Sequence, residues 1–320
     1  MSERPTLRLA TRASALAMWQ AEHVSALLTS AHPGLTVTIV PTTTEGDRRL
    51  DVPLSEIGGK GVFATEVQEA VLDGRADVAV HSAKDLTAVT AARLTLAAIP
   101  ERGDPRDALV GSTLADLPLG AVVATGSARR RALLADARPD LEFAELRGNM
   151  ATRLSKAEKF DAIVVAAVAL ERLGLSEHIT HYFDPEVFVP QVAQAALGIE
   201  CRSEDTATIE LLAAIDHAPS RQRVLAERAF LAELGGDCSL PAGAHASFNA
   251  AGGLTLRGVL ASQVGGPVAR GSIDIPASSG ADYDSAPNPT APVAADSGVR
   301  AGGPGAELAA QLRDMVEAGR

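Results

Sequence analysis

Apolar residues follow two alternating patterns along the first two thirds of the chain. Short runs of branched apolar residues predict strands, and longer stretches with an apolar residue every third or fourth position predict helices. We expect strands at 7–10, 36–40, 76–81, 94–99, 121–124, 141–146 and 161–165. We expect helices at 14–28, 62–72, 127–135 and 149–160. Strands that alternate with helices are typical of α/β layers around mainly parallel sheets.

The pattern changes after Pro219. A helix predicted at about 220–234 ends at two glycines, and glycine-rich turns then separate the next predicted strands, 245–249, 254–262 and 268–275. This order indicates a small α+β domain. Residues 277–305 are rich in Ala, Ser, Gly, Pro and Asp, which predicts a disordered insertion before a terminal helix at 307–318.

Composition narrows the class of protein. The 320 residues suggest about two or three domains. A net charge of -11 and an aromatic content of 3% argue against a nucleic-acid-binding protein, which needs a basic surface or stacking aromatics. The sequence has neither an apolar run of membrane-spanning length nor a signal-peptide pattern. We therefore expect a cytoplasmic protein that binds neither membrane nor nucleic acid, with its two cysteines as free thiols.

Basic residues recur where predicted strands give way to helices. Arg12 follows the first strand, Lys84 follows 76–81, Arg129 and Arg130 follow 121–124, and Arg147 follows 141–146. Ligands of open α/β sheets bind beyond the carboxyl ends of the strands. Clustered arginines at a helix N-terminus oppose the helix dipole unless an anion compensates them. The recurrence predicts a positive cleft for a small polyanion, although a surface ion pair explains Lys84 and Asp85 equally well by position alone.

The two cysteines have different settings. Cys238 lies in a loop between a helix end and a strand, where a thiol can be exposed for attachment or nucleophilic chemistry. The usual alternative is a small buried residue, and Cys201 fits that alternative better. His178 and His181 have HxxH spacing without an accompanying acid or cysteine cluster, so we expect no metal site.

Six short motifs together resemble the porphobilinogen deaminase family. They are LATRAS at 9–14, GGKG at 58–61, AVHSAKD at 79–85, LRGN at 146–149, TRL at 152–154 and GIECR at 198–202. They occur in the family's order, and the likeness covers about residues 6–262. No single motif suffices, but together they are highly specific.

The resemblance implies an α/β fold with two periplasmic-binding-protein-like lobes. Their sheets would be mixed and mainly parallel, and a small C-terminal α+β domain would follow. The expected domains are 1–101 with 196–219, 102–195, and 220–320. The chain would cross twice between the lobes, near 100–105 and 190–198.

The resemblance also implies an activity and a cofactor. The family joins four porphobilinogen molecules head to tail on a covalent dipyrromethane primer and releases hydroxymethylbilane. Asp85 matches the catalytic carboxylate, which stabilises positive charge on pyrrole nitrogens and shuttles protons. Cys238 matches the cysteine that holds dipyrromethane through a thioether. No metal is used, and we expect a monomer.

The remaining site residues are carried over from the same resemblance. The expected cofactor-binding residues are Cys238, Lys84, Asp85, Thr125, Ser127, Arg129, Arg130, Arg147 and Gln194. The expected substrate-binding residues are Arg12, Ser14, Lys60, Arg147, Arg153 and Arg172. Guanidinium forks suit the acetate and propionate arms of pyrroles, because they bind carboxylates in a bidentate manner.

The chain departs from the family pattern at several positions. Ala193 and Ala195 replace glycines on either side of Gln194, Gly126 stands where serine is common, and Asp237 precedes Cys238 where glycine is common. The main rival function is a non-catalytic, two-lobed polycarboxylate-binding protein, which would need neither Asp85 nor Cys238. A cysteine-dependent acyl transferase lacks a convincing histidine partner.

Overall fold

The computed structural model describes residues 6–44, 63–235, 240–262, 266–277 and 303–319. They form two compact units. Among the described residues, the first unit is built from 6–44, 63–102 and 196–225, and the second from 103–195, 226–235, 240–262, 266–277 and 303–319. The predicted glycine loop with Lys60, the loop with Cys238 and nearly all of the 277–305 insertion lie outside the described residues.

The first unit contains a five-stranded sheet in the order β2-β1-β3-β10-β4. Its strands are β1 (Thr6–Arg12), β2 (Thr36–Thr42), β3 (Val78–Ser82), β4 (Leu94–Ala98) and β10 (Leu197–Arg202). Its helices are α1 (Ala15–Ala31), α4 (Thr65–Leu72), the short 3-10 helix η1 (Ala83–Asp85) and α8 (Thr206–Ala213). Strand β10 runs antiparallel to both of its neighbours, so the other four strands point the same way.

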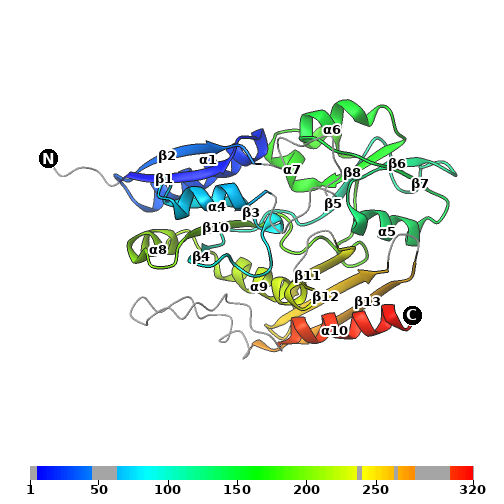
Figure 1. Ribbon diagram of the computed structural model, residues 1–320. Helices are drawn as coiled ribbons and strands as arrows, with labels where there is room; N and C mark the ends of the chain where they lie inside the picture. The colour runs from blue at the N-terminus through cyan, green and yellow to red at the C-terminus, as the bar shows by residue number, and fades with distance from the viewer. Residues whose placement is uncertain (1–5, 45–62, 236–239, 263–265, 278–302, 320) are drawn as a thin grey trace. The chain divides into compact units, whose positions relative to one another are not determined.

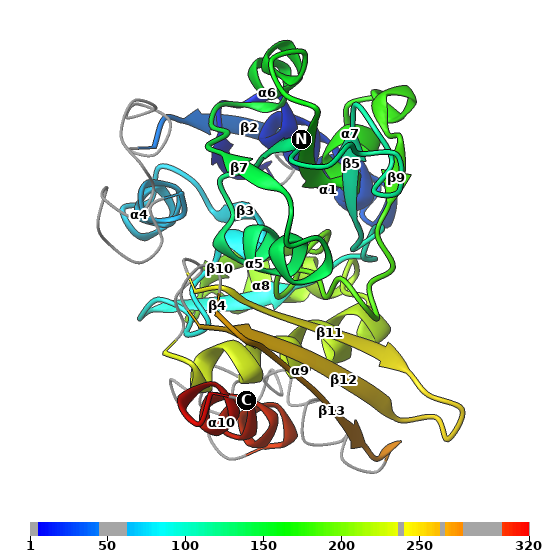
Figure 2. The ribbon, with the colours of Figure 1, turned by 90° about the vertical axis from the view of Figure 1, so that its right-hand side faces the viewer.

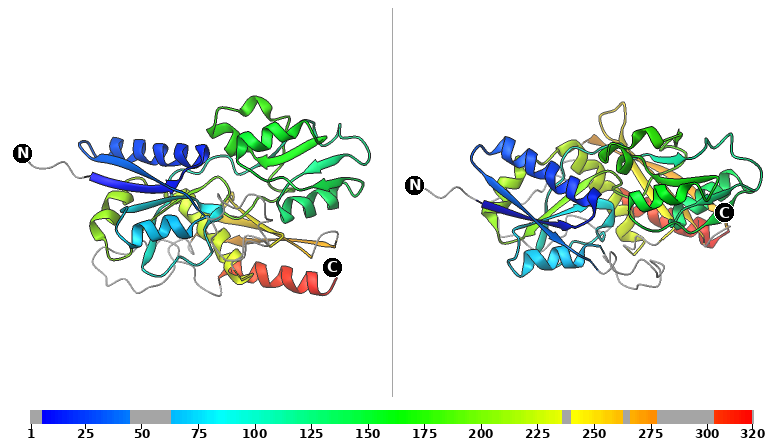
Figure 3. Two further views of the ribbon diagram at one scale, coloured as in Figure 1. Left: turned by 45° about the horizontal axis from the view of Figure 1, so that its top comes forward. Right: turned by 90° about the horizontal axis from the view of Figure 1, so that it is seen from above.

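Apolar side chains alternate between the two faces of this sheet, and each face is covered. Leu7, Leu9 and Val80 pack with residues of α1 and α8 on one face. Ala10 and Ala79 pack with α4 on the other. Figure 3 shows α1 lying along β1 and β2. Burial on both faces explains the continuous apolar run Val78–Val80 of β3.

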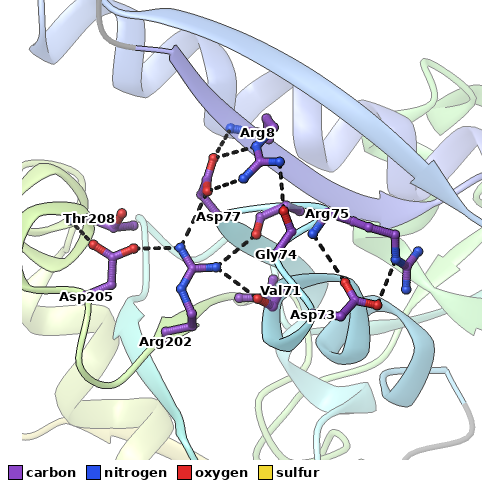
Figure 4. A network of polar contacts seen from close by, with 10 residues as sticks. Arg8, Val71, Asp73, Gly74, Arg75, Asp77, Arg202, Asp205 and Thr208 are labelled. Carbon is purple, nitrogen blue, oxygen red and sulfur yellow. Dashed lines mark hydrogen bonds and ion pairs between the residues drawn. The ribbon is translucent and has the colours of Figure 1, made fainter.

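A polar network ties strands of the first unit together (Figure 4). Asp77, just before β3, accepts hydrogen bonds from the backbone, Nε and Nη2 of Arg8 at 2.7 to 3.0 Å. Arg202 of β10 reaches Asp77 at 3.5 Å and Asp205 at 2.8 Å. The network therefore links β1, the start of β3 and the end of β10.

The second unit contains another five-stranded sheet, in the order β7-β6-β8-β5-β9. Its strands are β5 (Asp107–Val110), β6 (Val122–Ala124), β7 (Glu142–Ala144), β8 (Ala162–Ala166) and β9 (His181–Tyr182). The helices around it are α5 (Ala128–Ala137), α6 (Met150–Ala157), α7 (Ala167–Arg172) and the 3-10 helix η2 (Ser176–His178). Here β5 is the strand that runs antiparallel to its neighbours.

The second unit also contains a three-stranded antiparallel sheet. It consists of β11 (Ala242–Phe248), β12 (Leu254–Ala261) and β13 (Val268–Ile275). Figure 2 shows helix α10 (Pro304–Glu317) lying beside it. Gly258 and Gly271 allow that close packing, because an added Cβ would lie 3.0 to 3.2 Å from Leu308 or Leu312. Helix α9 (Ala218–Glu233) begins in the first unit and ends in the second.

The two five-stranded sheets have the same topology. Figure 1 labels β1, β2, β3, β4 and β10 of the first sheet. In each sheet, one antiparallel strand stands between the third and the last of the other four. In the first unit that strand is β10, which comes after the whole of the second sheet in sequence. In the second unit it is β5, which comes directly after β4. The chain thus passes twice between the sheets, as the resemblance implies.

The predicted α/β class, the mixed sheets and the C-terminal α+β region are confirmed. Two central strands, β5 and β10, were not expected from the sequence, because Asp107 leaves only three apolar residues in β5 and Glu200 interrupts the apolar residues of β10. Helix α6 is shorter than predicted, ending at Ala157, and β7 is limited to three residues. None of the helices in the described ranges is long and apolar enough to cross a lipid bilayer.

The return crossing to the first unit contains an unusual backbone. Ala193 and Ala195 have φ angles of 58° and 70°, in the left-handed region that favours glycine. Both side chains are buried. The resemblance leads us to expect glycine at these two positions, and the two alanines adopt backbone angles that favour glycine.

Replacing Ala195 with glycine should leave stability almost unchanged. Relief of the left-handed strain, worth about 1–2 kcal/mol, offsets the lost methyl burial and the greater entropy of the unfolded chain. The control is Ala196→Gly, a buried neighbour outside the left-handed region, which should cost about 1–2 kcal/mol. Urea unfolding measures both. Equal losses for the two variants would show that the strain is not real.

Candidate functional site

A pocket opens in the first unit where β1 and β3 end. It is lined by Arg12, Ser14, Leu16, Ala17, Gln20, Phe63, Val80, His81, Ser82, Lys84 and Asp85. Four predicted site residues, Arg12, Ser14, Lys84 and Asp85, are therefore brought together. The carboxyl ends of parallel strands are the usual place for a ligand in such sheets.

Local backbone structure positions these side chains. Ser14 caps α1, and its hydroxyl accepts a hydrogen bond from the Ala17 N–H at 3.4 Å. Lys84 and Asp85 lie half-buried in η1, directly after β3. The Ala83 N–H donates to the Ala196 carbonyl at 2.9 Å, which fixes the start of this turn. The guanidinium of Arg12 lies 4.2 Å from the centre of the Phe63 ring, a cation–π contact.

The second unit contains a buried ion cluster around Asp107. Arg129 Nη2 and Arg130 Nη2 each lie 2.7 Å from an Asp107 oxygen, and Gln194 Nε2 donates to Asp107 at 2.9 Å. Asp107 and Gln194 are fully buried, and both arginines are nearly so. Burial raises the pKa of Asp107, but the charges of the two arginines outweigh it and hold that pKa below its ordinary range.

The cluster changes the argument made from the sequence. Clustered arginines at the start of α5 need a compensating anion. From the sequence alone, we expect that anion to be a ligand. Asp107 supplies the negative charge from within the protein. The signal for it was present, as an acidic residue that opens the apolar run Ala108–Val110, but sequence reasoning missed it. Cofactor binding by Arg129, Arg130 and Gln194 stays a prediction.

Arg147 has a different environment in the same unit. Its Nη1 is buried and has no hydrogen-bond partner. It follows β7 and precedes Gly148, whose φ of 116° lets the chain turn into α6. An added Cβ at Gly148 would lie 2.7 Å from Thr152, so glycine is required there. A buried guanidinium nitrogen without a partner suits an incoming carboxylate.

Four other predicted residues of the second unit make contacts within the protein. The Thr125 hydroxyl accepts from the Ser127 N–H at 3.2 Å, and Ser127 caps α5. Arg153 Nε donates to the Gly148 carbonyl at 2.8 Å. Arg172 Nη2 donates to the carbonyl of Ala195 at 2.7 Å, and burial lowers its pKa to about 10. These contacts position the side chains but do not test ligand binding.

Two histidines and one cysteine have structural explanations. Cys201 is fully buried in β10, and burial raises the pKa of its thiol to about 12, so it is the inert cysteine expected. His181 packs edge-on against Phe183, and the His178 side chain is about half exposed. The part of the chain that the structure describes holds no group of three or more side chains suited to a metal ion.

Comparison with known proteins gives consistent matches over most of the chain. Residues 7–210 match the family described as porphobilinogen deaminase, dipyromethane cofactor binding domain. Residues 221–278 match porphobilinogen deaminase, C-terminal domain. The porphobilinogen deaminase of Syntrophotalea carbinolica is 48% identical over 275 residues, which cover 84% of this chain and 87% of the relative.

A second relative agrees with the first. The porphobilinogen deaminase of a Roseiflexus species is 49% identical over 267 residues, covering 82% of this chain and 88% of its own length. Among solved structures, the methionine-binding protein MetQ is 13% identical with a TM-score of 0.40, covering 72% of this chain and 95% of that one. That structural similarity is too weak to bear on function.

Asp107→Asn should destabilise the second unit by about 3–5 kcal/mol, because it leaves two buried guanidinium groups without their shared charge. The folded-state pKa of Asp107 lies below its unfolded value. Its stabilising contribution is therefore complete above about pH 4 and is lost as pH falls toward the folded-state pKa. Urea unfolding between pH 3 and pH 7 should show this acid loss in the parent protein and a flatter profile in the variant.

Asp136→Asn is the matched control. Asp136 pairs with Arg270 at 2.6 Å in the same unit, but both side chains are about 40% exposed. An exposed pair contributes roughly 0–1 kcal/mol, so its loss should change stability little. Equal effects at the two positions would contradict the importance given to the buried cluster.

Proposed function

The chain belongs to the porphobilinogen deaminase family, and from that premise we propose that Asp85 is its catalytic carboxylate and Cys238 its point of cofactor attachment. The protein is a transferase of tetrapyrrole biosynthesis that uses a dipyrromethane cofactor. The observation that carries the proposal is the pocket that brings Asp85 together with Lys84 and Arg12.

The residues present fit a dipyrromethane group. Each of its pyrroles carries an acetate and a propionate arm, so the group needs several cationic partners. Arg147 offers a buried nitrogen without a hydrogen-bond partner, which a carboxylate would satisfy. Arg147, Thr125, Ser127, Arg129, Arg130 and Gln194 would hold the group in the second unit, and Lys84 and Asp85 in the first. When bound, it supplies the nucleophilic pyrrole carbon to which the first substrate is joined.

The chemistry asked of Asp85 follows from charge. When porphobilinogen loses ammonia from its aminomethyl group, positive charge spreads onto the pyrrole nitrogen. A fixed carboxylate near that N–H stabilises the charge more strongly than water does, because its orientation needs no rearrangement. The same carboxylate can accept the proton released when the new carbon–carbon bond forms. Asp85 is half-buried, so it is accessible to a ligand in the pocket while partly shielded from solvent.

Basic side chains have the complementary task of binding the substrate's carboxylates. Arg12 and Ser14 line the same pocket as Asp85, and Arg153 and Arg172 belong to the second unit. The protein is acidic overall, so its net charge would repel an anion. These local positive charges would attract the substrate's carboxylates to the site. Lys60, which lies outside the described residues, completes the proposed substrate-binding set.

The finer organisation is also part of the proposal. We place three domains at 1–101 with 196–219, 102–195 and 220–320, and a thioether on Cys238. We expect the enzyme to work as a cytoplasmic monomer. The non-catalytic binding protein remains the rival function, and it needs neither Asp85 nor Cys238.

Intact mass tests the attachment site. The purified protein should be heavier than its sequence by one dipyrromethane, and Cys238→Ser should have only the mass of the bare chain. Cys201→Ser is the matched control, since a thiol buried in β10 should not carry the group, and that variant should keep the added mass. Added mass that persists in Cys238→Ser would rule out the proposed thioether.

Turnover tests the catalytic carboxylate. Asp85→Asn preserves the shape of the side chain but removes its charge, so formation of hydroxymethylbilane should fall by roughly 10²–10⁴-fold. The circular dichroism spectrum and unfolding midpoint should remain close to those of the parent, because Asp85 is half-buried in a surface turn. Near-normal turnover would refute the role of Asp85.

A further inference from the structure

The buried pair of His81 and Glu200 adjoins the pocket that contains Asp85, and it has no role in the chemistry proposed for Asp85. His81 is one of the residues that line the pocket. Its Nε2 lies 3.3 Å from Oε2 of Glu200, and the two side chains are 3% and 1% exposed. The same Glu200 oxygen accepts a hydrogen bond from Gln68 Nε2 at 2.7 Å.

Sheet register explains how these residues meet. Ala79 of β3 pairs with Glu200 of β10, and His81 pairs with Gly198. Residues two apart on a strand share a face, so His81 and Glu200 are diagonal neighbours on one side of the sheet. Gln68 comes from α4, which covers that side. A line of polar groups therefore runs from the helix, through Glu200, to the wall of the pocket.

A carboxylate in this position needs a physical reason. Removing a charged group from water is costly unless partners compensate it, and an apolar residue could fill the same volume. A carboxylate beside one nitrogen of an imidazole fixes the orientation of the ring and favours the form with hydrogen on that nitrogen. His81 Nε2 has no partner within hydrogen-bond geometry, although Glu200 is close. Such contacts commonly tighten when a ligand binds.

We infer that Glu200 is a positioning residue for the Asp85 pocket and acts through His81. Glu200 lies beside one nitrogen of the imidazole and so fixes the orientation of the ring. That orientation determines which atoms of His81 face a ligand in the pocket that Lys84 and Asp85 also line. The inference rests on the proposed function of this pocket. The rival explanation is purely structural, with Glu200 serving only to tie β10 to α4 through Gln68.

Glu200→Gln separates the two explanations. The amide oxygen can still accept from Gln68 Nε2, so the link to α4 survives, whereas the charge beside His81 is lost. We expect kcat to fall about tenfold or more, as happens when the outer partner of an active-site histidine is removed, with KM changed less than about threefold. A purely structural role predicts an unchanged kcat in the folded variant.

A double-mutant cycle tests whether Glu200 acts through His81. In a His81→Gln background, adding Glu200→Gln should lower kcat by less than about twofold, because the ring it positions is already gone. A loss in that background as large as in the parent would overturn the inference. If Glu200→Gln fails to fold, Glu200→Asp replaces it. The shorter side chain withdraws the carboxylate from His81, and we expect kcat to fall about two- to fivefold. An unchanged kcat in Glu200→Asp would then overturn the inference.

Asp77→Asn is the matched control. It makes the same carboxylate-to-amide change in the same unit and weakens the network of Arg8 and Arg202, away from the residues that line the pocket. It should lower the unfolding midpoint and leave kcat unchanged. A matching fall in kcat would mean that loss of stability alone explains the Glu200 effect.

An NMR measurement tests the inference independently of turnover. The imidazole ¹⁵N resonances of His81 in the holoprotein should shift in Glu200→Gln and remain in place in Asp77→Asn. Unshifted resonances in Glu200→Gln would contradict the inference. Failure of the proposed function is a separate outcome, because it would appear as absent porphobilinogen turnover in the parent protein.

Discussion

The second unit depends on neutralising one fully buried carboxylate. Asp107 opens the antiparallel strand β5, and it meets two arginines from the first turn of α5 and the amide of Gln194. A central strand, a helix N-terminus and the segment returning to the first unit are therefore held by one charge. Two nearly buried arginines at that helix end would be costly without such an anion, because burial removes their charges from water and the helix dipole also disfavours them.

The same topology organises both five-stranded sheets. In each, the strand that breaks the parallel arrangement is the one contributed across a crossing, β10 in the first unit and β5 in the second. Both crossing strands carry a buried acid, Glu200 and Asp107 respectively. Each acid contacts polar side chains near strand ends, where ligands of such sheets bind. Internal carboxylates thus contact His81 in the first unit and Arg129 and Arg130 in the second.

Sequence patterns predicted the elements whose apolar periodicity is clear. Strand β3 and helix α1 fall close to their predicted ranges, because Val78 and Val80 are buried and Ser14 is a recognisable cap. Strands β5 and β10 were missed because Asp107 shortens the apolar run of β5 and Glu200 interrupts that of β10, while partners far away in sequence compensate their burial. Local pattern cannot reveal such partners. The left-handed backbone at Ala193 and Ala195 was equally hidden, since alanine does not signal it.

The candidate site was predictable to a different degree in each unit. Arg12, Lys84 and Asp85 line one pocket, as expected from strand ends, because position along a parallel sheet determines which side chains meet. Position at a strand end does not distinguish Arg147, whose Nη1 has no hydrogen-bond partner, from Arg129 and Arg130, which bind Asp107. That distinction depends on burial and on the location of a single carboxylate.

A crystal structure of the holoprotein would test the central claim most directly. It should show the Asp85 carboxylate within hydrogen-bond distance of a pyrrole N–H and Arg147 Nη1 bound to a carboxylate. A dipyrromethane bound to a different surface, with Asp85 facing solvent and Arg147 Nη1 still without a partner, would contradict the account.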